Sequence, residues 1–212
     1  MVPLPHALFE ATETPFPPPK GCGVLVRAGD SQTKGNIVIV DTTIDLATLR
    51  YIIGSGAAAI ALAGWRTGAD LQRLAALLSV AEAEEGRGDG TTPVLAITDG
   101  ILPAPVSREG VAGKTMRLAA LVWDQRALKR TLGATCALTA SDEWIAPFAA
   151  ARAATLLTAA VAGVPAFDSF PVLTGAALER ACEHSRDEGF FGGFAVDTAQ
   201  VAPIGTIYGR SR

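Results

Sequence analysis

The segment Leu118-Ala-Ala-Leu-Val-Trp-Asp-Gln-Arg-Ala-Leu-Lys-Arg-Thr-Leu-Gly133 contains the pattern that decides the fold. An unbroken apolar run is followed by Asp124, by a stretch with helical spacing and by a glycine. Continuous apolarity indicates a strand buried on both faces, as in a parallel sheet. Asp is common just before a helix, and glycine is common just after one. The segment therefore predicts a strand that leads directly into a helix.

The same unit recurs along the chain. Further strands are predicted at 23–26, 36–40, 57–62, 93–97, 164–167 and 193–196, and helices at 45–53, 69–85, 125–132, 145–162 and 175–188. This alternation indicates an α/β fold, either an open doubly wound sheet or a (β/α) barrel. A barrel typically needs ~250 residues, and the chain has 212. We therefore expect a barrel that is trimmed at its N-terminal end or completed by a neighbouring subunit.

The N-terminal region differs from the repeating units in composition. Prolines occur at positions 3, 5, 15, 17, 18 and 19, which favours an extended segment over a regular element. We interpret 1–20 as a proline-rich arm outside the core, and 21–212 as a single barrel domain.

Composition excludes several classes of protein. Hydrophobic residues make up 49% of the chain and charged residues 18%, which is too apolar for a disordered protein. The net charge of −3 and the lack of a Lys/Arg run argue against a nucleic-acid partner. The apolar stretch 145–161 is too short to span a membrane and contains Arg152. Three widely spaced cysteines suit a reducing compartment, so we expect a cytoplasmic protein.

Charged residues follow most of the predicted strands. Because the carboxyl ends of parallel strands meet at one edge, these side chains are predicted to share one mouth. Carboxylates there could hold a hard divalent cation, and arginine could clamp a carboxylate or phosphate. The alternative is that each Asp only caps the helix that follows it. The residues concerned are Arg27, Asp41, Arg66, Asp99, Asp124, Asp168 and Asp197.

From Asp45 onward the sequence resembles the citrate lyase β-subunit-like branch of the HpcH/HpaI aldolase family. The resemblance rests on 45–62, on Ala120-Leu-Val-Trp-Asp-Gln-Arg-Ala-Leu-Lys-Arg-Thr-Leu-Gly133, on Ala151 to Asp168 and on Gly189 to Ile204. It implies a TIM-type barrel, assembled as a trimer or hexamer. It also implies cleavage or formation of a carbon–carbon bond next to a carboxylate or CoA thioester, usually with Mg²⁺.

The family's active-site motifs are altered in this sequence. The positions of the two metal-binding acids fall on Thr98 and Ala127, and that of a motif lysine falls on Gly64. The His-Pro of the last motif has become Asp197-Thr198. Neither Thr nor Ala can supply the charged oxygen that Mg²⁺ requires. Arg27 matches the arginine that grips the substrate carboxylate in the family.

Three hypotheses follow from these substitutions. In a rebuilt lyase, Asp99 and Asp124 would hold the metal, Asp99 and Asp197 would act in catalysis, and Arg27 and Asp168 would bind the substrate. Alternatively, the chain is a non-catalytic homologue that binds a small carboxylate or acyl-CoA, or that assembles with an active paralogue. The third hypothesis is a metal-independent enzyme on the same scaffold.

Overall fold

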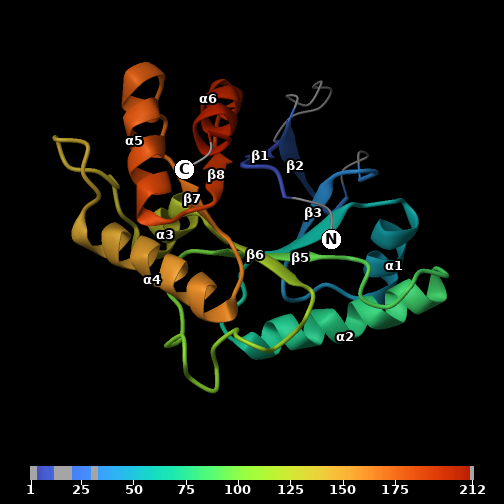
Figure 1. Ribbon diagram of the computed structural model, residues 1–212. Helices are drawn as coiled ribbons and strands as arrows, with labels where there is room; N and C mark the ends of the chain where they lie inside the picture. Colours follow the sequence, from blue (N-terminus) through green and yellow to red (C-terminus); the bar gives the residue numbers. More distant parts are fainter. Residues whose placement is uncertain (1–3, 12–20, 30–32, 211–212) are drawn as a thin grey trace.

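The computed structural model describes residues 4–11, 21–29 and 33–210 and shows a closed barrel of eight parallel strands (Figure 1). The strands are β1 Ala7–Glu10, β2 Cys22–Arg27, β3 Ile37–Val40, β4 Ala59–Leu62, β5 Val94–Thr98, β6 Leu118–Trp123, β7 Ala166–Ser169 and β8 Gly192–Ala195. The helices outside them are α1 Leu46–Gly54, α2 Gly68–Glu84, α3 Gln125–Leu132, α4 Ala146–Ala162, α5 Gly175–Glu188 and α6 Thr198–Tyr208. The TIM-type barrel predicted from the sequence is therefore confirmed.

The barrel is neither trimmed nor completed from outside, because β1 lies within the region interpreted as a proline-rich arm. β1 pairs with β2 on one side and with β8 on the other. The boundary at residue 21 was therefore wrong, since prolines on both sides of this short strand concealed it. The rest of the arm, 1–3 and 12–20, lies outside the described residues.

Alternation along the strands divides the core into two parts. One apolar cluster takes every second residue from all eight strands and so fills the barrel interior, with Leu8, Leu25, Ile97, Phe167 and Phe194 among its members. The larger cluster contains the intervening strand residues together with residues of the helices. Both faces of each strand are thus buried, as the continuous apolar runs indicate.

Closure of the barrel depends on a glycine in β8. A Cβ atom added to Gly192 would collide with the carbonyl oxygen of His6 and would lie 2.7 Å from Cε1 of Phe167. Only a residue without a side chain allows the backbone to approach this closely. The neighbouring Gly193 donates its N–H to the same His6 carbonyl at 2.8 Å, which joins the chain segment before β1 to β8.

The ends of the helices follow the chemistry expected from the sequence. Asp124 and Asp197 accept N-cap hydrogen bonds at the starts of α3 and α6, and Thr67 and Asp70 form a capping box at α2. Left-handed glycines follow α3, α4 and α5. The sequence analysis missed α6, which contains Pro203. Among the described residues, no helix is long and apolar enough to cross a membrane.

Candidate functional site at the barrel mouth

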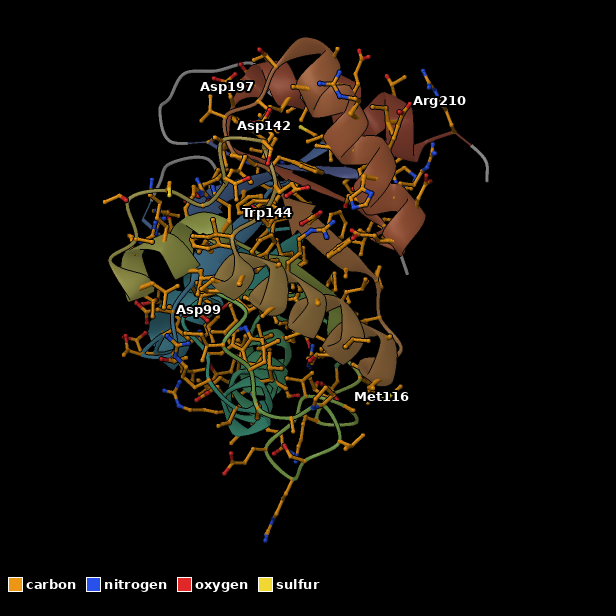
Figure 2. All side chains as sticks on the ribbon, turned by 90° about the vertical axis from the view of Figure 1, so that its left-hand side faces the viewer. Asp99, Met116, Asp142, Trp144, Asp197 and Arg210 are labelled. Carbon is orange, nitrogen blue, oxygen red and sulfur yellow. The ribbon has the colours of Figure 1, made fainter. Side chains whose placement is uncertain are left out.

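Four charged residues that line one cavity lie at the carboxyl ends of strands and continue the inward positions of the barrel. A fifth, Asp41, follows the interior Ile39 of β3 in the same way but lines a neighbouring cavity with Arg27. Glu10 ends β1 two residues after the interior Leu8, and Arg27 ends β2 two residues after Leu25. Asp99 and Asp124 follow the interior Ile97 of β5 and Val122 of β6 by the same interval. Because alternate strand residues face the same side, all four point toward the mouth. Figure 2 shows Asp99 on the opposite side of the molecule from Met116, which precedes β6.

These side chains line a cavity of ≈ 240 Å³ at the mouth, which we call the mouth cavity. Its remaining lining comes from β3, the segment after β4, β5, α3 and β8. The lining residues are Glu10, Arg27, Ile39, Ala63, Gly64, Trp65, Arg66, Ile97, Thr98, Asp99, Asp124, Ala127, Arg130, Thr131 and Phe194. The structure therefore brings together Arg27, Arg66, Asp99 and Asp124, four of the seven charged residues selected from the sequence.

Glu10 is held between two arginines. Its Oε1 accepts a hydrogen bond from Nη2 of Arg27 at 2.6 Å, and its Oε2 accepts one from Nη2 of Arg126 at 2.8 Å. The Glu10 side chain is nearly buried, whereas 69% of the Arg27 side chain is exposed. The sequence analysis missed Glu10, because it placed this residue in the arm.

Asp99 is held by a third arginine, Arg66. Nη1 of Arg66 donates to both carboxylate oxygens, at 3.0 and 2.9 Å. The Thr131 hydroxyl donates to Oδ2 at 3.2 Å, and the backbone N–H of Ile101 donates to Oδ1 at 3.0 Å. Both oxygens of this nearly buried carboxylate therefore have partners.

Asp124 shares Arg126 with Glu10. Its Oδ1 accepts hydrogen bonds from the backbone N–H and from Nε of Arg126, both at 2.9 Å. Burial lowers the pKa of the Arg126 guanidinium, but the attraction of Asp124 and Glu10 outweighs this and raises it overall. The Arg126 guanidinium also lies over the ring of Phe194, 5.0 Å from its centroid. Arg126 therefore stays charged and links α3 to β1 and β8.

Two donors of the mouth cavity have no partner within the described part of the chain. Arg130 on α3 is exposed and forms no hydrogen bond or ion pair there. Trp65, which follows β4, is buried, and its indole N–H has no acceptor. The sequence analysis missed both residues. Ala127 occupies the position of a metal-binding acid in the family, and Arg130 follows it by one turn of α3. This spacing was the feature of the sequence that indicated a place for Arg130 at the mouth.

Known structures resemble this chain over most of its length. RipC from Yersinia pestis shares 21% sequence identity, with a TM-score of 0.71 over 98% of this chain and 96% of that one. A citrate lyase from Burkholderia xenovorans shares 12%, with a TM-score of 0.74 over 97% and 77%. A citrate lyase β subunit from Mycobacterium tuberculosis, complexed with oxaloacetate and magnesium, shares 15%, with a TM-score of 0.65 over 89% and 87%.

The chain has the citrate lyase β-subunit fold. This similarity in structure agrees with the resemblance that the sequence motifs show. Neither a scan against protein-family models nor a search of the curated proteins found a match. The shared fold fixes where the strand ends meet, but the chemistry depends on the side chains at the mouth.

The citrate lyase β-subunit fold holds magnesium in the Mycobacterium tuberculosis structure, but the residues present here do not fit that ion. Glu10, Asp99 and Asp124 each accept hydrogen bonds from an arginine guanidinium. Mg²⁺ needs charged oxygens that are free to complete an octahedral shell. The described residues contain no group of three His, Cys, Asp or Glu side chains that could hold a metal ion.

Besides Asp41, two residues selected from the sequence lie away from the mouth cavity. Asp168 follows the interior Phe167 of β7, so its side chain points outward, where it contacts Arg152 and Ser185. Asp197 caps α6 through the backbone N–H of Ala199 at 2.8 Å, and Figure 2 shows it well apart from Asp99. The expectation that they would join the other charged residues at the mouth was wrong. Asp197 instead caps the helix that follows it, as the alternative interpretation of the sequence predicts.

Proposed function

We propose that this chain binds a small organic carboxylate in the mouth cavity without a divalent metal. The observation that carries the proposal is Arg130, a guanidinium without a partner among the described residues, beside carboxylates that arginines already hold. A planar guanidinium can accept a ligand carboxylate in a bidentate pair.

Charge and size support the same ligand class. Three carboxylates line the mouth cavity, Glu10, Asp99 and Asp124, and four arginines line or contact it, Arg27, Arg66, Arg126 and Arg130. Because Arg126 contacts Glu10 and Asp124 but does not line the cavity, the lining itself is neutral. Its carboxylates are already paired with arginines, so among the described residues Arg130 is the charged group that remains for an anion. A cavity of ≈ 240 Å³ is smaller than the ~300–1,000 Å³ of typical drug-sized sites. The carboxylate ligand is accordingly a small one.

Replacement of Arg130 by alanine tests the proposed contact. We expect Arg130→Ala to weaken binding of pyruvate or oxaloacetate about tenfold, because it removes one charge-assisted pair. Isothermal titration calorimetry with the chelator-treated protein measures this. Arg180→Ala is a matched control, because Arg180 on α5 is also exposed and without a partner among the described residues but lies outside the mouth cavity. Equal affinities of the two variants would contradict the proposal.

Metal independence is a separate expectation. Because every carboxylate of the mouth cavity is paired with arginine, adding Mg²⁺ or Mn²⁺ is expected to change the affinity for oxaloacetate less than twofold. Titration of the metal alone is expected to give no saturable heat. Stoichiometric metal binding that Asp99→Ala or Asp124→Ala abolishes would instead support the rebuilt lyase site.

The second candidate function is a carbon–carbon lyase, favoured by the fold shared with the citrate lyase structures. Asp99 would then be the carboxylate nearest to the reaction, released from Arg66 as substrate binds. Incubation with 3-hydroxy acids and their CoA thioesters, with and without Mg²⁺, tests for release of a 2-oxo acid or acetyl group. A turnover that Asp99→Asn removes would favour the lyase.

The proposal extends to larger ligands and to assembly. A Mycobacterium tuberculosis structure with this fold contains magnesium, acetoacetate and coenzyme A, so an acyl-CoA thioester whose acyl end enters the mouth cavity is the larger alternative ligand.

We also retain a homo-oligomer, a trimer or hexamer, as part of the proposal. Leu157 and Val161 on α4 support it, because both large apolar side chains are exposed.

A further inference from the structure

A second cavity of ≈ 400 Å³ lies outside the barrel, and we call it the outer cavity. It is bounded by α4, α5, the end of β7 and the segment that precedes α4. Figure 2 shows Asp142 and Trp144, which belong to that segment, above Asp99. The lining residues are Leu138, Asp142, Glu143, Trp144, Ala149, Arg152, Ala153, Asp168, Phe170, Pro171, Leu173, Ala181, His184 and Glu188. None of them lines the mouth cavity.

The outer cavity carries an excess of negative charge. Its carboxylates are Asp142, Glu143, Asp168 and Glu188, and its one arginine is Arg152. Arg152 is nine-tenths buried and already paired with both Asp168 and Glu188. Among the described residues, Asp142 and Glu143 have no cationic partner. His184 lies 3.3 Å from Glu188 and adds a positive charge only when it is protonated.

The uncharged part of the outer cavity's lining is apolar, and the ring of Trp144 in it is held in a fixed position. The Trp144 ring packs edge-on against Trp123, with centroids 5.0 Å apart, and lies parallel to the ring of Phe148. An isolated bridge between Leu138 and Trp144 closes the segment that carries Asp142 and Glu143. The two carboxylates without a cationic partner therefore line the same cavity as an ordered indole ring.

We propose that the outer cavity binds a small organic cation, an ammonium group attached to an apolar body. The ammonium is attracted by Asp142 and Glu143 and by the face of an aromatic ring. The apolar body packs against Leu138, Phe170 and Leu173. The carboxylate excess repels an anion. A metal ion is not the ligand, because the described residues form no group of three metal-binding side chains.

Three probes of similar shape and different charge test this proposal. Benzylammonium, benzyl alcohol and benzoate are titrated into the intact protein at pH 7, and binding is followed by calorimetry and tryptophan fluorescence. Benzylammonium is expected to bind with 1:1 stoichiometry, about tenfold more tightly than benzyl alcohol. Benzoate is expected not to displace benzylammonium. Equal affinities of the charged and neutral probes would overturn the proposal.

Variants locate the binding of benzylammonium. The double substitution Asp142→Asn/Glu143→Gln changes exposed side chains and is expected to weaken binding about tenfold. Glu179→Gln is the matched control, because Glu179 is exposed on α5 but does not line the outer cavity. Arg130→Ala, at the mouth cavity, is expected to leave binding unchanged. If the double variant bound as tightly as the unmodified protein, the cation would bind elsewhere and the proposal would fail.

Discussion

We expect Asp168→Asn to lower the free energy of unfolding by about 3 kcal/mol, because it removes one partner of a buried ion pair. Nε of Arg152 donates to both oxygens of Asp168, at 3.0 and 2.9 Å, and Nη2 donates at 2.7 Å. The Ser185 hydroxyl also donates to Asp168 and accepts a hydrogen bond from Tyr208. The substitution removes the charge of Asp168 and leaves the buried Arg152 guanidinium paired only with Glu188.

Urea unfolding followed by circular dichroism measures this loss. Asp187→Asn is the control, because Asp187 forms an exposed pair with Arg186 and its loss is expected to cost under ~1 kcal/mol. The affinity for pyruvate is expected to stay unchanged in Asp168→Asn under conditions in which the variant is folded. Weaker pyruvate binding without a loss of stability would show instead that Asp168 binds the ligand.

We expect Glu82→Gln to cost about 3 kcal/mol at pH 7 and to flatten the dependence of stability on acid pH. The Glu82 side chain is fully buried on α2. It accepts hydrogen bonds from Nη1 and Nη2 of Arg117 at 3.0 and 2.7 Å. The backbone N–H groups of Thr92 and Gly90 donate to it at 2.7 and 2.9 Å.

The sign of the pH effect follows from the pKa of Glu82. Burial alone would raise this pKa, but the hydrogen bonds from Arg117, Thr92 and Gly90 lower it from the ordinary 4.5 to about 2. Between these two values the unfolded state binds more protons than the folded state. The contribution of Glu82 to stability is therefore complete above pH 4.5 and disappears as the pH falls toward 2.

Urea unfolding at pH 7, 4.5 and 3 tests this expectation. The unmodified protein is expected to lose stability over this range more steeply than Glu82→Gln. Glu84→Gln is the control, because 41% of the Glu84 side chain is exposed beside Arg50. A Glu82→Gln variant with the same pH slope as the unmodified protein would contradict the assignment.

The sequence predicted the strands from β2 to β8 and the helices from α1 to α5, because each combines an apolar run or helical spacing with an end signal. It did not predict β1, since Ala7–Glu10 is short and lies between prolines. It also missed α6, where Pro203 and Gly205 interrupt the helical pattern.

At the mouth, the sequence predicted which residues follow strands but not which way each of them points. A strand buried on both faces shows no apolar–polar alternation, so nothing in Pro165 to Asp168 indicates that Asp168 points outward. Once Phe167 is known to fill the barrel interior, the direction of Asp168 follows. Arg126 was visible in the sequence, but its pairing with Glu10 can be predicted only if β1 is recognised as a strand.

The contact between β1 and β8 joins residues that are very distant in the sequence. Nδ1 of His6 lies 2.8 Å from the carbonyl oxygen of Phe191, a residue 185 positions later in the chain. Contacts between such distant positions carry a large loop-closure entropy and slow folding. During synthesis, β1 therefore has a partner in β2 early but must wait for β8. Arg126 contacts Glu10 of β1 and Phe194 of β8, so the mouth cavity is complete only when the first and the last strand of the barrel are both in place.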